Sequence, residues 1–175
     1  MDISQDYFAC YSLSRIFDLD TGALRQSHRA LQQAYHPDRF VSHGDAEQRR
    51  AVQTTAYLNQ AFATLSAPLQ RGIYLLQLLG MDPMAPTNTQ MPMDFLLQQI
   101  ELRETMEELA QVPDPEPALA AFAQQLQGQA TQLEAEFAHS YAQHGYASAE
   151  TAVRKLQFIV KLQQQLDALE GELLD

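Results

Sequence analysis

Apolar residues recur every three or four positions along most of the chain, and this is the period of an amphipathic helix. In the first half the spacing predicts two long helices, one capped by Asp20 and ending near Tyr35 and one capped by Asp45. Pro37 disfavours helical backbone at His36, and this is why the first helix should end there. Two long helices joined by a short loop should pack antiparallel.

Each of the two helices carries a single apolar stripe. The first stripe is Leu24, His28, Leu31 and Tyr35, and the second is Val52, Ala56, Leu58, Asn59, Phe62 and Leu65. Short apolar segments at 6–13 and 68–80 flank the pair, and each is long enough to cover the open face of the hairpin. The first half therefore predicts a helical hairpin with short flanking helices.

A breaker-rich stretch, "LGMDPMAPTNTQMP" at 79–92, separates this hairpin from three further helical patterns. These patterns cover 93–109, 116–143 and 148–173, and the last carries Ile159, Leu162, Leu166, Leu169 and Leu173. Few segments show the alternation of a strand, and the loops are short, so we expect an all-α chain ending in an antiparallel three-helix bundle. The predicted domains are 1–79 and 93–175, with 80–92 as linker.

Charge is distributed unevenly between the two halves. The net charge is −11, yet residues 1–79 balance seven lysines and arginines against seven acids, whereas residues 80–175 carry four against fifteen. This argues against nucleic acid as a partner of the second half, because phosphate binding depends on cations. The single cysteine excludes an internal disulfide and a site of several thiolates. Without a leader-like or bilayer-spanning apolar run, we expect a cytoplasmic protein away from membranes.

The triplet His36-Pro37-Asp38 stands at the predicted tip of the hairpin. By itself the triplet could simply end the helix, with Pro37 stopping the helix and Asp38 beginning a turn. Cationic side chains gather around it, however, in a half that is otherwise neutral. They include Arg25, Arg29, Arg39, Arg49 and Arg50.

An enzyme is the alternative to a binding protein. It would be a hydrolase that uses His36 as base and Asp38 as the carboxylate that orients it. We see no arranged nucleophile beside them, and side chains on either side of a proline should point in different directions. Distant residues could still complete such a site. Hydrolysis of a substrate by this protein alone would identify such an enzyme.

The helix predicted at 93–109 has more apolar surface than one core stripe needs. Helical geometry of about 100° per residue places Phe95, Leu102, Met106 and Leu109 on one face. Off that face lie Leu96, Leu97 and Ile100, beside Glu101, Glu104, Glu107 and Glu108. A second neighbouring helix could bury the three apolar residues, or they could form a docking surface whose acids select a basic partner.

The segment "YHPDRF" between two such helices resembles the signature of the J-domain, the module by which DnaJ-type co-chaperones engage DnaK-type ATPases. The resemblance implies that the loop and the basic face of the preceding helix contact the ATPase and trigger ATP hydrolysis. The corresponding positions are His36, Pro37, Asp38, Arg25, Arg29 and Arg39. Many J-domains have lysines where this chain has Gln32 and Gln33, so a specialised partner is expected.

Three further segments, "LNQAFATLSAPLQRGIYLL", "FLLQQIELRETMEE" and "VRKLQFIVKL", are similar to the HscB family of co-chaperones over essentially the whole chain. This resemblance implies a J-domain coupled to a three-helix bundle that binds the iron-sulfur scaffold IscU and brings it to the ATPase HscA. The scaffold-binding positions it implies are Leu96, Leu97, Ile100, Glu101, Glu104, Glu108 and Phe158. The cysteine-pair zinc segment of some eukaryotic relatives has no counterpart here, so we expect neither metal nor cofactor.

Periodicity alone leaves Phe158 open between core packing and docking, because it lies at the edge of the leucine stripe. Two further alternatives concern the whole protein. It could be a J-domain adaptor for another client, or a structural oligomer built on a coiled coil of residues 148–173. That stripe spans under four heptads and is interrupted by Gln163, so we expect it to pack within its own bundle, and we expect a monomer without covalent chemistry of its own.

Overall fold

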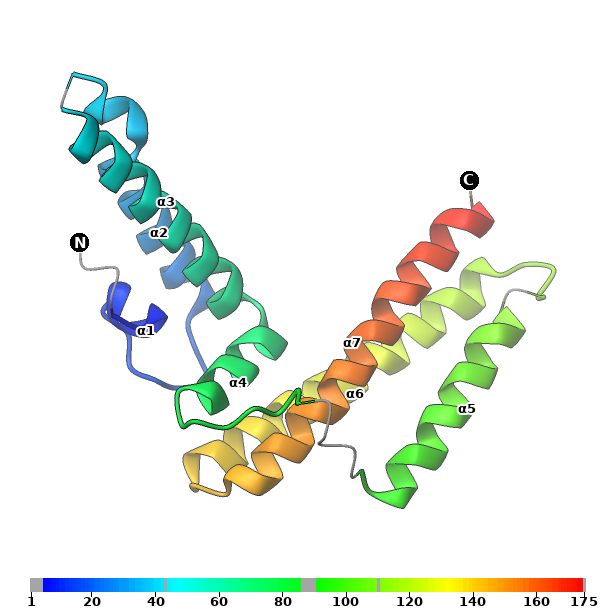
Figure 1. The fold of residues 1–175 in the computed structure, drawn as a ribbon. Coiled ribbons are helices and arrows are strands. Elements are labelled where there is room, and N and C mark those ends of the chain that lie inside the picture. Colours follow the sequence, from blue (N-terminus) through cyan, green and yellow to red (C-terminus); the bar gives the residue numbers. More distant parts are fainter. Residues whose placement is uncertain (1–4, 43, 86–90, 110, 175) are drawn as a thin grey trace. The chain divides into compact units, whose positions relative to one another are not determined.

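The computed structural model describes residues 5–42, 44–85, 91–109 and 111–174, and the ordered elements in these ranges are helices, without a strand (Figure 1). The predicted all-α fold is therefore confirmed. The chain divides into two compact units, Met1–Leu78 and Leu79–Asp175. The predicted linker falls partly outside the described residues.

The first unit contains α1 (Tyr7–Cys10), α2 (Thr21–Tyr35), a 3-10 turn η1 (Pro37–Phe40), α3 (Asp45–Ser66) and α4 (Pro68–Gln77). Helices α2 and α3 run antiparallel side by side, and α1 and α4 both pack against α3 (Figure 1). This is the predicted hairpin with short flanking helices, and its tip carries η1.

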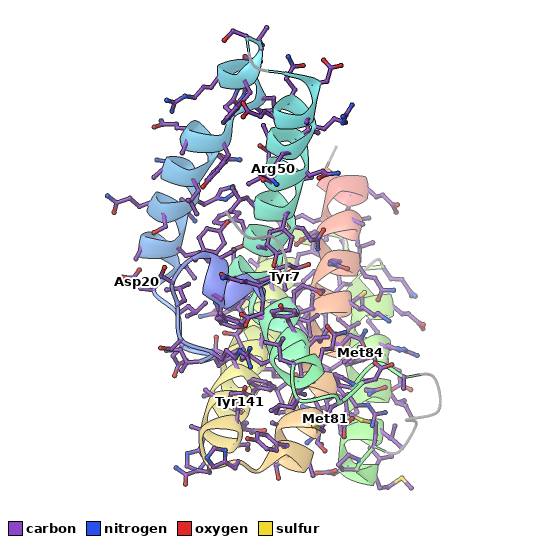
Figure 2. All side chains as sticks on the ribbon, turned by 60° about the vertical axis from the view of Figure 1, so that its left-hand side comes forward. Tyr7, Asp20, Arg50, Met81, Met84 and Tyr141 are labelled. Carbon is purple, nitrogen blue, oxygen red and sulfur yellow. The ribbon has the colours of Figure 1, made fainter. Side chains whose placement is uncertain are left out.

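Local chemistry explains where α2 begins and ends. Asp20, at the start of α2 in Figure 2, accepts a hydrogen bond from the backbone N–H of Ala23 at 2.9 Å, so the predicted N-cap is confirmed. Helix α2 ends at Tyr35, directly before His36, whose ψ of 130° is outside the helical region. The predicted cap of α3 is wrong by one position, since Asp45 is its first helical residue and Gly44 precedes it without a side-chain cap.

The buried face of α3 differs from the predicted stripe. Leu58 and Leu65 are buried as expected, but Val52 is 55 % exposed and Ala56 and Asn59 are exposed as well. The positions that are buried instead are Ala51, Thr54 and Ala61. Three- and four-residue spacing selects a single face of the helix, whereas α3 packs against α1, α2 and α4, and these three neighbours decide which of its positions are buried.

His28 sits in the core of the first unit, as its place in the stripe of α2 predicted. Its ring stacks on Phe62 with centroids 4.2 Å apart, and its Nδ1 is 2.8 Å from the hydroxyl of Tyr11. That hydroxyl donates to the carbonyl of Leu58 at 3.0 Å, so its oxygen is left to accept the proton on Nδ1. Burial lowers the pKa of His28, because the charged imidazolium would be desolvated there.

The second unit contains α5 (Met93–Leu109), α6 (Glu116–Ala142) and α7 (Tyr146–Leu174). Helices α6 and α7 pack along their length as an antiparallel pair, and α5 packs on α7 (Figure 1). The predicted three-helix bundle is confirmed. Ile159, Leu162 and Leu166 of the leucine stripe are buried, but Leu169 is half-buried and Leu173 is exposed, because the bundle covers α7 less completely toward its end.

Candidate functional site

The tip of the hairpin is a turn closed by its own backbone and side chains. Pro37 opens η1, and the N–H of Arg39 donates to the carbonyl of His36 at 3.0 Å. The N–H of Asp38 donates to Nδ1 of His36 at 3.3 Å. Both the imidazole and the carboxylate are exposed. The turn therefore has a defined shape and presents two polar side chains to solvent.

One expectation about this tip is wrong. The side chains of His36 and Asp38 do not point apart, since Nδ1 lies 3.6 Å from Oδ2. In the neutral imidazole, an Nδ1 that accepts from a backbone N–H carries no proton, so the proton is on Nε2. A carboxylate that orients a catalytic base needs an Nδ1–H donor facing it, and this geometry does not provide one.

Three side chains tie the turn to the helices beneath it. Arg39 Nη1 donates to the carbonyl of Gln33 at 3.2 Å, and Thr55 Oγ1 donates to the carbonyl of Tyr35 at 3.1 Å. On the other side, Gln48 Nε2 donates to the carbonyl of Val41 at 2.9 Å. Helix periodicity marks Thr55 and Gln48 only as polar positions, so their role at the turn could not be predicted from the sequence.

Beside the tip lies an open hollow of about 640 Å³ between α2 and α3. Its lining residues are Arg29, Gln32, Gln33, His36, Thr55 and Asn59. Gln32 and Asn59 bridge the two helices through a side-chain hydrogen bond of 2.9 Å. Of the predicted chaperone-binding residues, Arg29 and His36 thus share one hollow, whereas Arg25, Pro37, Asp38 and Arg39 do not line it. Arg25, Arg29 and Arg39 are all exposed.

The structure separates the two faces of α5 as the spacing predicted. Phe95 and Leu102 are only 4 % and 3 % exposed, while Leu97 and Ile100 are 56 % and 54 % exposed, and Leu96 is 39 % exposed. Glu101, Glu104 and Glu108 are exposed on the same helix. Met93, at 70 % exposure, extends the apolar surface and was not predicted. Met106, expected in the core, is half-buried.

Phe158 lies on the side of α7 that meets α5. Its ring packs edge-on against Phe95 with centroids 5.8 Å apart, and the guanidinium of Arg103 lies 5.4 Å from the centre of the Phe158 ring. The residue is half-buried, so it serves the α5–α7 contact and still presents part of its surface. Neither core packing nor docking alone describes its position.

The described residues give little support for a metal site or a membrane-spanning segment. In those ranges no three His, Cys, Asp or Glu side chains form a group that could hold a metal ion. Among the helices described, none is long and apolar enough to cross a membrane.

Burial raises the pKa of the Cys10 thiol to about 11, which keeps it protonated and unreactive at neutral pH.

Comparison with known proteins gives matches along nearly the whole chain. A family model described as the HSCB C-terminal oligomerisation domain matches residues 91–167. Curated co-chaperone HscB homologues from Vibrio cholerae and Aeromonas hydrophila are 37 % and 38 % identical, and both alignments cover 97 % of this chain and 99 % of the relative.

Solved structures agree with these matches. The chaperone HscB from Vibrio cholerae superposes with a TM-score of 0.86 at 36 % identity, covering 97 % of this chain and 99 % of that one. The human co-chaperone HscB gives 0.90 at 25 % identity, covering 99 % and 86 %.

A helical hairpin with an exposed His-Pro-Asp tip, followed by a three-helix bundle, defines a J-domain co-chaperone. Within that class the chain belongs to the HscB family.

Proposed function

We propose that this chain binds an IscU-like iron-sulfur scaffold and delivers it to an HscA-like ATPase, whose ATP hydrolysis it stimulates. The observation that carries the proposal is the pair of exposed surfaces on separate units, the turn at His36–Asp38 in one and the apolar, acidic face of α5 in the other. The family supplies the expected partners, and the described geometry supports each role.

The turn suits a trigger that is read by another protein. Its backbone is closed by internal hydrogen bonds, and Thr55 and Gln48 hold both of its ends against α3. A preformed turn loses little conformational entropy on docking. The Nε2–H of His36 and the Asp38 carboxylate then offer one donor and one acceptor to the ATPase. Exposed Arg25 and Arg29 on α2 and Arg39 in the turn add positive charge to the same unit.

The face of α5 suits a client-docking surface. Burying the exposed parts of Leu97, Ile100 and Leu96 would contribute roughly 1 kcal/mol or more each before the costs of association. Glu101, Glu104 and Glu108 on the same helix favour a partner with basic side chains. Phe158 contributes an aromatic side chain, and aromatic residues are enriched in the cores of protein interfaces.

Together the two surfaces make an adaptor. Holding the scaffold on one unit while the other engages the ATPase raises the effective concentration of the client at the chaperone. The chain itself makes and breaks no covalent bond in this mechanism. A monomeric state and a cytoplasmic location belong to the same proposal and stay predictions.

Steady-state hydrolysis of ATP by the cognate HscA-like chaperone tests the first half. We expect stimulation by this protein, further increased when the scaffold is added. His36→Gln should abolish the stimulation but keep the affinity for the scaffold, because the tip and α5 belong to different units. His139→Gln, at an exposed position of α6, is the matched control. Undiminished stimulation by His36→Gln would contradict the proposed role of the turn.

Calorimetric titration with the scaffold tests the second half. Leu97→Ala and Ile100→Ala should each weaken binding by about fivefold or more, with no loss of helicity. Leu173→Ala truncates an exposed leucine at the end of α7, 37 % exposed, and should leave the affinity unchanged. A loss of helicity in the α5 variants would show that these residues stabilise the bundle instead.

A further inference from the structure

Helices α5 and α7 meet at a reciprocal pair of cation–π contacts. The guanidinium of Arg103, from α5, lies 5.4 Å from the ring centre of Phe158 on α7. The ammonium of Lys155, from α7, lies 5.3 Å from the ring centre of Phe95 on α5. The two rings pack edge-on at 85°. Each helix therefore supplies one ring and one cation to the other, and we call these four residues the α5–α7 clasp.

Helix α5 has few buried side chains that could fix its rotation about its own axis. Only Phe95, Leu102 and Leu109 are buried among the 17 residues of α5. Leu97 and Ile100 turn with the helix, so a small rotation about its axis would re-aim both of them. The clasp can oppose that rotation, because cation–π contacts require the cation to lie over the ring face.

We propose that Arg103 and Lys155 are positioning residues of the docking surface. They fix the rotation of α5 on α7 and the orientation of the Phe158 ring, so that Leu97, Ile100 and Phe158 are presented together before the partner arrives. The inference rests on the proposed function, since it concerns the same scaffold-binding surface. Its physical basis is preorganisation, which reduces the entropy lost on association.

Electrostatics alone predicts the opposite change in scaffold affinity when the charge of Arg103 is removed. The acids of α5 favour a basic partner, and a basic partner is repelled by the positive charge of Arg103. If that charge were the only contribution, removing it would tighten binding. Positioning predicts that its removal weakens binding, so the direction of the change separates the two roles.

Titration of the full-length protein with an IscU-like scaffold provides the test. Arg103→Met and Lys155→Met should each raise the Kd about two- to fivefold, the range expected for one exposed cation–π contact. Arg103→Lys should recover part of the loss, because lysine keeps the charge over the ring. Lys161→Met, at an exposed position of α7, removes the same charge away from the clasp and should not weaken binding.

A double-mutant cycle shows whether Arg103 affects scaffold binding through Phe158. If Arg103 acts through Phe158, Arg103→Met should have little further effect in a Phe158→Ala background, whereas its effect should persist in a Leu97→Ala background. Unchanged or tighter binding by Arg103→Met, or an equal loss in the Phe158→Ala background, would overturn the proposal.

Amide hydrogen exchange in the free protein supplies a readout that does not need the partner. The Arg103→Met/Lys155→Met variant should exchange faster than wild type in α5 and at the wild-type rate in α6. Unchanged exchange in α5 would rule out positioning. If the wild-type protein fails to bind the scaffold, the proposed function is wrong, and the exchange experiment still decides whether the clasp holds α5.

Discussion

The buried contact between Tyr11 and His28 makes the stability of the first unit sensitive to a single oxygen atom. Tyr11→Phe removes the hydroxyl that accepts from His28 Nδ1 and donates to the carbonyl of Leu58. His28 is only 7 % exposed, so water cannot readily replace the lost partner. A buried donor left without a partner costs about 1–3 kcal/mol. For a unit of this size we expect the melting temperature to fall by at least about 4 °C.

The double variant Tyr11→Phe/His28→Phe provides the sharper comparison. Replacing both partners of the Tyr11–His28 hydrogen bond with apolar rings of similar shape removes the buried imidazole N–H that Tyr11→Phe alone leaves unsatisfied, and such paired replacements can be nearly neutral. The double variant should therefore be more stable than Tyr11→Phe alone. A double variant that loses the full sum of the two single losses would refute the reasoning.

The same contact gives a pH dependence of defined sign. Burial lowers the pKa of His28 below its ordinary value of 6.5, so the unfolded chain binds this proton at a higher pH than the folded one does. The contribution of His28 is constant above about pH 6.5 and becomes destabilising as the pH falls below that value. His28→Phe should lack this component. Thermal unfolding followed by the amide NMR signals of α2 and α3 measures it, with those of α6 and α7 as an internal control.

Three further predictions concern single positions of the first unit. Asp20→Ala should lower the free energy of unfolding by about 1 kcal/mol through loss of the α2 cap, and Asp20→Asn should lose much less in the same chemical denaturation. Iodoacetamide at pH 8 should label Cys10 slowly in the native protein and rapidly in urea, because a thiol with a pKa of about 11 is only about one part in a thousand thiolate at that pH. Val52→Ala should change the free energy of unfolding by less than about 0.5 kcal/mol, whereas Leu58→Ala should cost about 2–5 kcal/mol, a contrast that denaturant titration can measure.

The α5 surface could be read from the sequence because helix geometry is local. Once 93–109 is assigned as a helix, the angles between residues separate Phe95 and Leu102 from Leu97 and Ile100 without knowledge of the neighbours. The structure confirms that separation. The exposure of Phe158 could not be predicted in the same way, because Phe158 is on α7 and its exposure depends on where α5 packs against that helix.

The sequence by itself determined which segments are helical, where the proline at 37 stops α2, and that α5 has apolar side chains beyond its core stripe. These features follow from interactions between residues a few positions apart. Only the tertiary structure decided that α3 buries Ala51 rather than Val52, that Tyr11 is the partner of His28, and that Thr55 supports the His36 turn. Each of these three features depends on which faces of the helices meet. The sum of many small packing energies between residues far apart in the sequence determines how the helices meet.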